Sequence, residues 1–143
     1  MTIWFDMDGT IADLYGVRGW LTDLEREKTR PYEIARPLVD TVELISLLVN
    51  LQTKDIKIGI ISWTARNGSH LYNSEVEKSK KQWLLRNFPN FSFDKIIIVP
   101  YGTNKSQFAA NGDILFDDEE GNRNIWGRNS YDETNIFRVL RTF

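Results

Sequence analysis

The sequence predicts an α/β fold in which helices cover both faces of a central parallel sheet of about five strands. Short apolar, β-branched runs alternate with stretches whose apolar residues recur at helical spacing. Little chain is left between them for hairpins, which favours parallel strands joined by helices. The length of 143 residues, with 41% hydrophobic and 27% charged residues, indicates a single globular domain over 1–143. We therefore expect a three-layer, Rossmann-like domain.

The first third of the chain supplies one strand, an insert and one helix. Ile3–Phe5 is a buried strand that ends at Asp6. Residues 14–37 hold two Gly, two Pro and many charged residues, which indicates an insert with one short helix, serving as a small cap or flap. Apolar residues then recur at helical spacing over 38–51, so we expect an amphipathic helix there.

The rest of the chain continues the alternation. A β-branched strand covers 56–61 and ends at Ser62. Ser74 and Glu77 fit a capping box, so we expect a helix from there to about Phe88, with His70 in the loop before it and Lys80 among the bases that suit its dipole. The remaining expected elements are strands over 96–99 and 113–116, a helix over 119–127 and a fifth strand over 136–140.

Polar side chains follow the predicted strands where each one ends. Asp6, Ser62 and Asp117 come directly after apolar runs. In parallel α/β sheets, ligands bind beyond the carboxyl ends of the strands, at the switch point of the topology. We therefore expect the strand order third, second, first, fourth, fifth, with the strand that precedes Asp6 at the centre.

These residue types indicate a site for phosphate chemistry with a hard cation. Asp6 and Asp8 are two residues apart, and such close carboxylates need a cation or a shared proton. The pair Asp117-Asp118 adds oxygen ligands of the kind that Mg²⁺ prefers. Each residue alone has an ordinary explanation, such as a capped turn or a solvated helix start, so the prediction depends on their joint occurrence.

Two cations and a serine complete the candidate set. Lys105, in a loop before a short helix, could balance the charge of a phosphate and of a nucleophile. Ser62 offers a hydroxyl that could hold a phosphate oxygen, and Arg66, four residues later, could bind the same phosphate. For Arg66, an exposed loop position is an equally good explanation.

Composition excludes several other classes of site and partner. With no Cys and a single His, thiolate sites, disulfides and multi-histidine metal centres are ruled out. The net charge of −2 leaves no global basic field for nucleic acid or an anionic membrane. No apolar run approaches the roughly 20 residues of a membrane span, and no signal peptide is apparent. We expect a soluble cytoplasmic protein without a membrane partner.

The motifs resemble those of the haloacid dehalogenase-like (HAD) hydrolases. The segment DMDGT over 6–10 is similar to the DxDGT signature of that superfamily, directly after an apolar strand. Ser62, Lys105 and Asp117-Asp118 resemble its second, third and fourth motifs, in the family's order and over nearly the whole chain. Within the superfamily, the segments DMDGTIAD, EKSKKQWLLRNF and ILFDD look most like those of the 5′(3′)-deoxyribonucleotidases.

This resemblance implies a role for each motif residue. Asp6 would be the nucleophile that forms an aspartyl-phosphate, and Asp8 the general acid and then the general base. The Asp6 carboxylate, the Asp8 carbonyl and Asp117 would hold Mg²⁺, with Asp118 in support. Ser62 and Lys105 would hold the phosphoryl oxygens. An Asp at position 8 favours phosphate esters over carbon–halogen bonds. The expected substrate is a small phosphorylated molecule, with deoxynucleoside monophosphates first.

The insert departs from the pattern of those nucleotidases. They usually carry a helical cap where this chain has only residues 14–37. So short an insert leaves little protein to enclose a leaving group, which predicts broad and modest selectivity. Trp20 and Trp63 could offer stacking faces to a base, although tryptophan more often belongs to the core.

Three alternatives differ in class. A receiver domain of two-component signalling uses similar groups, but its acidic pair comes early and its lysine last. A non-catalytic phosphate-binding module could use the same fold. A polynucleotide 3′-phosphatase-like enzyme would suit an open site and the locally basic insert, whereas the pI of 5.4 counts against a polyanionic substrate.

Overall fold

The computed structural model describes all residues, 1–143, and its centre is a five-stranded sheet. The strand order is β3-β2-β1-β4-β5, and every neighbouring pair is parallel, which confirms the predicted class and the predicted order of the first four strands. The strands are β1 (Thr2–Phe5), β2 (Lys57–Trp63), β3 (Lys95–Val99), β4 (Ile114–Phe116) and β5 (Ser130–Tyr131). The central position of β1 places the residues after it between the ends of β2 and β4.

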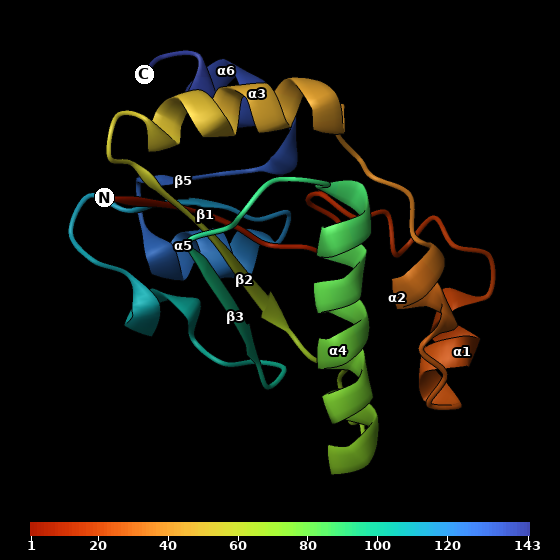
Figure 1. Cartoon of the computed structure of the whole chain (residues 1–143). Helices are drawn as coiled ribbons and strands as arrows, with labels where there is room; N and C mark the ends of the chain where they lie inside the picture. The colour runs from red at the N-terminus through yellow and green to blue at the C-terminus, as the bar shows by residue number, and fades with distance from the viewer.

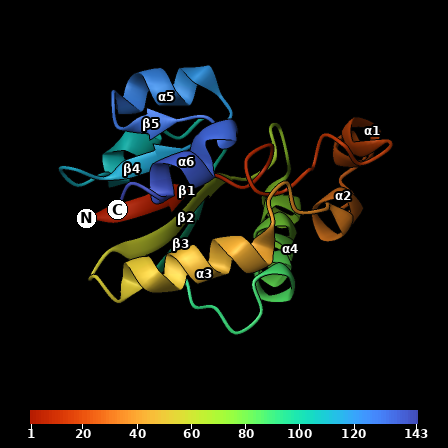
Figure 2. The ribbon, with the colours of Figure 1, turned by 90° about the horizontal axis from the view of Figure 1, so that it is seen from above.

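Helices cover both faces of the sheet, which gives three layers (Figures 1 and 2). The helices α3 (Thr41–Gln52), α4 (His70–Asn87) and α6 (Ile136–Leu140) contribute to one core with Ile3 and Phe5. The opposite face, with Trp4, packs against α5 (Glu120–Trp126) and the 3₁₀ turn η1 (Lys105–Phe108). Successive residues of β1 therefore face different layers, as the alternation of a strand requires.

A close contact between β1 and β2 explains one glycine. Gly59 lies beside Trp4 in the parallel register, and a Cβ on Gly59 would lie 2.5 Å from the Trp4 ring. Only glycine lets the indole lie against the neighbouring strand at this point. Trp4 is 1% exposed, so this packing closes one face of the central strand.

The insert folds as two short helices beside α4 rather than the one helix predicted (Figure 1). They are α1 (Trp20–Glu25) and α2 (Arg30–Ile34), separated by a turn in which Glu27 has a φ of 55°. Side chains of α4 fasten the insert, because Tyr72 Oη donates to the Lys28 carbonyl and Trp83 Nε1 to the Ala35 carbonyl, each at 2.8 Å. The insert is therefore a docked part of the domain.

The predicted fifth strand over 136–140 is wrong. These residues form α6, and Ile136, Val139 and Leu140 are buried. Their spacing of three and four residues puts them on one face of a helix, a pattern that the β-branched composition of the segment obscured. The true fifth strand, β5, has two residues at the sheet edge, and so short an edge strand carries no apolar run to mark it.

Two helix starts also differ from the prediction. α4 begins at His70, because the side chain of Ser69 caps it by accepting a hydrogen bond from the Tyr72 amide at 3.1 Å. His70 is thus helical, and the Ser74 motif lies inside the helix. The helix expected from Leu38 begins at Thr41, after Asp40, whose carboxylate accepts from the Glu43 amide. None of the helices combines the length and apolar character that crossing a membrane requires.

Candidate active site

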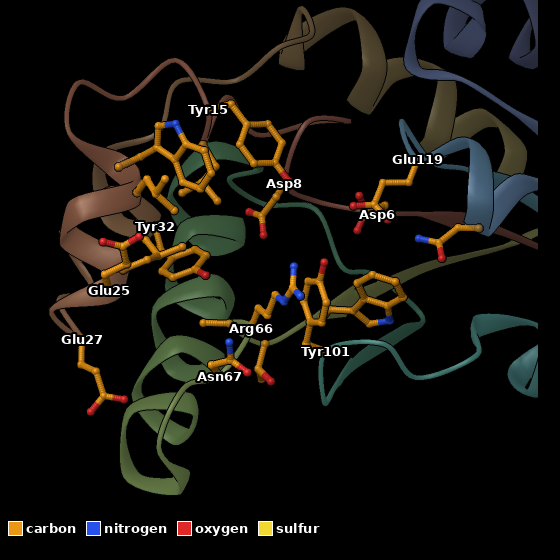
Figure 3. A pocket seen from close by; sticks show the side chains of 18 of the residues that line it. Asp6, Asp8, Tyr15, Glu25, Glu27, Tyr32, Arg66, Asn67, Tyr101 and Glu119 are labelled. Atoms are coloured by element: carbon orange, nitrogen blue, oxygen red, sulfur yellow. The ribbon is translucent and has the colours of Figure 1, made fainter.

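The turn after β1 points two carboxylates toward the carboxyl edge of the sheet. The Met7 carbonyl accepts hydrogen bonds from the amides of Thr10, Ile11 and Ala12, which folds the chain tightly over a buried methionine. Asp6 and Asp8 flank this residue, and both line the same cavity (Figure 3). The structure therefore brings the two acids of the first motif to one opening.

Asp6 meets the acidic pair that follows β4. Carboxylate oxygens of Asp6, Asp117 and Asp118 all lie within 4.8 Å of one another, close enough to share one cation. Lys105, from the start of η1, donates to Asp6 Oδ1 at 2.9 Å and to Asp117 Oδ2 at 2.7 Å. Lys105 is 4% exposed, so this ammonium is a buried partner of the cluster and not a surface lysine.

Thr10 and Gly9 position Asp118, the third carboxylate of the cluster. The Thr10 hydroxyl lies 3.3 Å from Asp6 Oδ2 and 3.2 Å from Asp118 Oδ1, and it accepts from the Asp118 amide. Gly9 has a φ of 81°, and a Cβ there would lie 2.3 Å from Asp118 Oδ2. The Asp-Gly-Thr part of the first motif is thus the packing surface for Asp118.

The protonation of the cluster reflects burial and crowding. Burial, together with the nearby Asp6 carboxylate, raises the pKa of Asp118 to about 8 and the pKa of Asp117 to about 6. Burial alone would lower the pKa of Lys105, but Asp6 and Asp117 raise it to about 12. The single Lys105 ammonium is too little positive charge for all three carboxylates to ionise readily together. A bound cation would reduce the repulsion among them.

A second buried lysine, which the sequence analysis considered only as a base that suits the helix dipole, contacts Asp8. Lys80 of α4 is 1% exposed and its Nζ lies 2.7 Å from Asp8 Oδ2. Burial raises the pKa of Asp8, and the Lys80 charge acts in the opposite direction. The overlooked signal is spacing, because Lys80 lies four residues after Val76 and three before Trp83, both on the buried face of α4.

Ser62 lies next to this lysine and not at the cavity surface. Its side chain is fully buried, and its hydroxyl accepts from Lys80 Nζ at 2.8 Å. Of the other predicted residues, Lys105 and Arg66 line the cavity, and Arg66 lies over the Tyr101 ring at 5.9 Å from its centroid. Asp117 and Asp118 belong to the acidic cluster behind Asp6.

The cavity has a volume of about 620 Å³ and aromatic walls. The insert contributes Tyr15, Trp20 and Tyr32, and the ends of β2 and β3 contribute Trp63 and Tyr101. Figure 3 shows the three tyrosines around the cavity. Two aromatic pairs stiffen these walls: Tyr15 with Trp20 edge to face at 4.9 Å, and Trp63 with Tyr101 at 4.8 Å. The short insert thus forms one wall of the cavity, and both tryptophans considered for stacking line it.

The charges around the cavity are mainly negative. The acids that line it are Asp6, Asp8, Glu25, Glu27 and Glu119, against two cations, Arg66 and Lys105. Lys105 donates to Asp6, whereas Glu25 and Glu27 lie at the end of the cavity away from Asp6 (Figure 3). Glu25 and Glu27 therefore make the end of the cavity away from Asp6 negatively charged.

Comparison with known proteins adds no family assignment: neither a scan against protein-family models nor a search of curated proteins found a match. The functional argument therefore depends on the residues of the site and on their geometry.

Proposed function

We propose that the protein is a Mg²⁺-dependent phosphomonoester hydrolase that acts on nucleotides through an aspartyl-phosphate at Asp6. The observation that carries this proposal is the placement of Asp6. Asp6 lines the cavity, accepts a hydrogen bond from the buried Lys105 and belongs to a carboxylate cluster with Asp117 and Asp118. The proposal agrees with the order of motifs that resembles the HAD hydrolases.

The donor set of the cluster fits Mg²⁺. When all three are ionised, the carboxylates would outnumber the one ammonium beside them, and all the side-chain donors of the cluster are oxygens. Asp6, Asp117 and Asp118 would hold the ion, together with the Asp8 carbonyl that the resemblance implies. A bound Mg²⁺ neutralises phosphate charge, so an anionic substrate can approach a carboxylate nucleophile.

In the first half-reaction, a carboxylate oxygen of Asp6 attacks phosphorus. The new carboxylate–phosphorus bond forms while the bond from phosphorus to the ester oxygen breaks. Asp8 gives its proton to the departing alkoxide, and the raised pKa of Asp8 favours the protonated form that this step needs. Lys105 neutralises negative charge next to the reacting group.

In the second half-reaction, water attacks the phosphorus of the aspartyl-phosphate. Asp8, now ionised, takes a proton from this water, and the bond from phosphorus to Asp6 breaks to release inorganic phosphate. The enzyme returns to its starting state with Asp6 ionised and Asp8 protonated. Arg66 and Lys105, which both line the cavity, are the cations that would hold the phosphoryl oxygens.

The cavity walls support a nucleoside as the leaving group. A space of about 620 Å³ lies within the usual range for small-molecule sites, and aromatic side chains provide faces for a flat base. Glu25 and Glu27 would repel further phosphates but can accept hydrogen bonds from a base. These charges favour a mononucleotide over the nucleic-acid end that a 3′-phosphatase takes.

A phosphatase assay tests the proposal. We expect release of phosphate from p-nitrophenyl phosphate and from deoxynucleoside monophosphates, loss of activity with EDTA and recovery with Mg²⁺. Asp6→Asn should be inactive, whereas Asp55→Asn, at an exposed position outside the site, should match the wild type. Binding of nucleotides without any turnover in Mg²⁺ would instead favour the non-catalytic phosphate-binding module.

A further inference from the structure

Lys80 uses every donor that an ammonium has. Its Nζ donates to Asp8 Oδ2 at 2.7 Å, to Ser62 Oγ at 2.8 Å and to the Trp63 carbonyl at 2.6 Å. The face of the Tyr32 ring lies 5.2 Å away. The three N–H groups are thus all engaged, and an aromatic face covers the charge on a further side.

Stability alone does not account for such a lysine. Burying an ion pair costs desolvation that its attraction does not reliably recover, and apolar side chains of similar size often serve a fold as well or better. All the polar partners of Lys80 lie where β1 and β2 end, next to the cavity. A role at the site explains this placement better than packing does.

Lys80 does not touch a molecule in the cavity. It is 1% exposed and is not among the cavity-lining residues, whereas Asp8 lines the cavity. Any effect of Lys80 on the reaction must therefore pass through Asp8. Since Ser62 and Trp63 belong to β2, the ammonium fixes one Asp8 oxygen to the rigid sheet.

We propose that Lys80 is a positioning residue that holds the Asp8 carboxyl group in the orientation for proton transfer to the leaving oxygen. This inference rests on the proposed phosphatase function and adds a residue to it. A carboxyl at the end of a loop can rotate, and misplacement by about 1 Å can cost on the order of 100-fold in rate. Holding Oδ2 leaves the rest of the Asp8 carboxyl directed to the cavity.

The dependence on the leaving group isolates this role. The leaving group of a simple alkyl phosphate is a poor one that needs the proton from Asp8. The leaving group of 2,4-dinitrophenyl phosphate is a stable phenolate that departs without a proton. A substitution that disturbs only Asp8 therefore slows hydrolysis of the alkyl ester far more than hydrolysis of the dinitrophenyl ester. A substitution that damages the fold slows hydrolysis of both esters equally.

The experiment compares kcat/KM for both esters in the wild type, Lys80→Met, Lys80→Gln and Asp8→Asn. Lys81→Met is the matched control, since Lys81 is the next residue and its half-exposed side chain pairs only with Glu77. The ratio of the two constants in one sample does not depend on the fraction of folded protein. Lys80→Gln keeps hydrogen-bond donors and covers the case in which Lys80→Met does not fold.

We expect both Lys80 variants to lose about 10- to 100-fold more activity toward the alkyl ester than toward the dinitrophenyl ester, in the direction of Asp8→Asn. Lys81→Met should keep the wild-type ratio. Equal losses on both esters would overturn the positioning role and leave the phosphatase proposal standing. A wild type that hydrolyses neither ester in Mg²⁺ would overturn both.

Discussion

At the scale of single residues, the two acids of the first motif differ in what holds them. Asp6 forms an ion pair with Lys105 within the carboxylate cluster, whereas Asp8 forms an ion pair with Lys80 and lies outside that cluster. In the proposed reaction, Asp6 would thus lie beside the cation and Asp8 beside the leaving group. This difference predicts two different failures on mutation.

Asp6→Asn should abolish turnover because an amide is not a competent nucleophile toward phosphorus. Asp8→Asn should reduce turnover by on the order of 10²–10⁴ through loss of proton transfer. For an activated ester, which needs no proton, the Asp8 variant should accumulate phosphoenzyme, detectable as a mass increase after acid quenching. Substantial activity in Asp6→Asn would refute the assignment of the nucleophile.

The raised pKa values of Asp117 and Asp118 predict how stability depends on pH. An unfolded aspartate titrates near 4, so the folded protein holds these protons more tightly than the unfolded chain does. This contribution to stability is full below about pH 4 and is lost as pH rises toward the folded pKa values, about 6 and about 8. A cation would bind the ionised forms and oppose the loss.

Thermal melting with EDTA and with Mg²⁺, across this pH range, measures the effect. We expect the Tm gain from Mg²⁺ to be larger near pH 8 than near pH 6, because fewer protons must then be displaced. Asp118→Asn should weaken the pH dependence in EDTA, since it removes the group with the higher pKa. An increase in Tm with Mg²⁺ that is the same at every pH would contradict this account.

At the scale of elements, the insert connects the cavity to the body of the domain. Its helices supply Trp20 and Tyr32 to one wall, and α4 holds it through Tyr72 and Trp83. The same helix α4 carries Lys80 to Asp8. One element therefore contacts both Asp8, the proposed general acid, and the insert that forms one wall of the cavity.

Trp20→Ala should separate binding of the leaving group from chemistry. Loss of one stacking face predicts a KM increase of about 5- to 150-fold for a nucleoside monophosphate, corresponding to roughly 1–3 kcal/mol. For an alkyl phosphate too small to reach α1, kcat/KM should stay near the wild-type value, and Trp20→Phe should restore most nucleotide binding. Equal losses on both substrates would show that Trp20 serves the fold alone.

At the scale of the whole molecule, charge argues for a small substrate. The chain has a net charge of −2, and carboxylates outnumber cations around the cavity. A polyanion would meet repulsion at the outer end of the site. The exposed arginines of the insert, such as Arg18 and Arg26, do not line the cavity.

Measuring kcat/KM for a deoxynucleoside monophosphate and for a 3′-phosphorylated oligonucleotide at two salt concentrations tests this conclusion. We expect the mononucleotide to be preferred, with a weak dependence on salt. A strong preference for the oligonucleotide that falls steeply with salt would report several phosphate contacts. That result would support the 3′-phosphatase alternative.

From the sequence, the parallel sheet, the order of its first four strands and the acidic residues at its carboxyl edge could be predicted. Buried strands are continuous apolar runs, and in a parallel sheet the residues that follow them meet at one edge. Asp6 and Asp117 were predictable as neighbours for this reason. The spacing of Ile136, Val139 and Leu140 was also in the sequence, but β-branched composition favoured a strand.

The side chains that contact those acids could not be predicted from the sequence, because they depend on tertiary packing. Lys80 is an ordinary helical lysine in the sequence, and its burial follows from how α4 packs between the sheet and the insert. Likewise, two short helices enclose an aromatic cavity only because α4 holds them beside the strand ends. Contacts between residues 18 or 72 positions apart depend on packing, which no local pattern specifies.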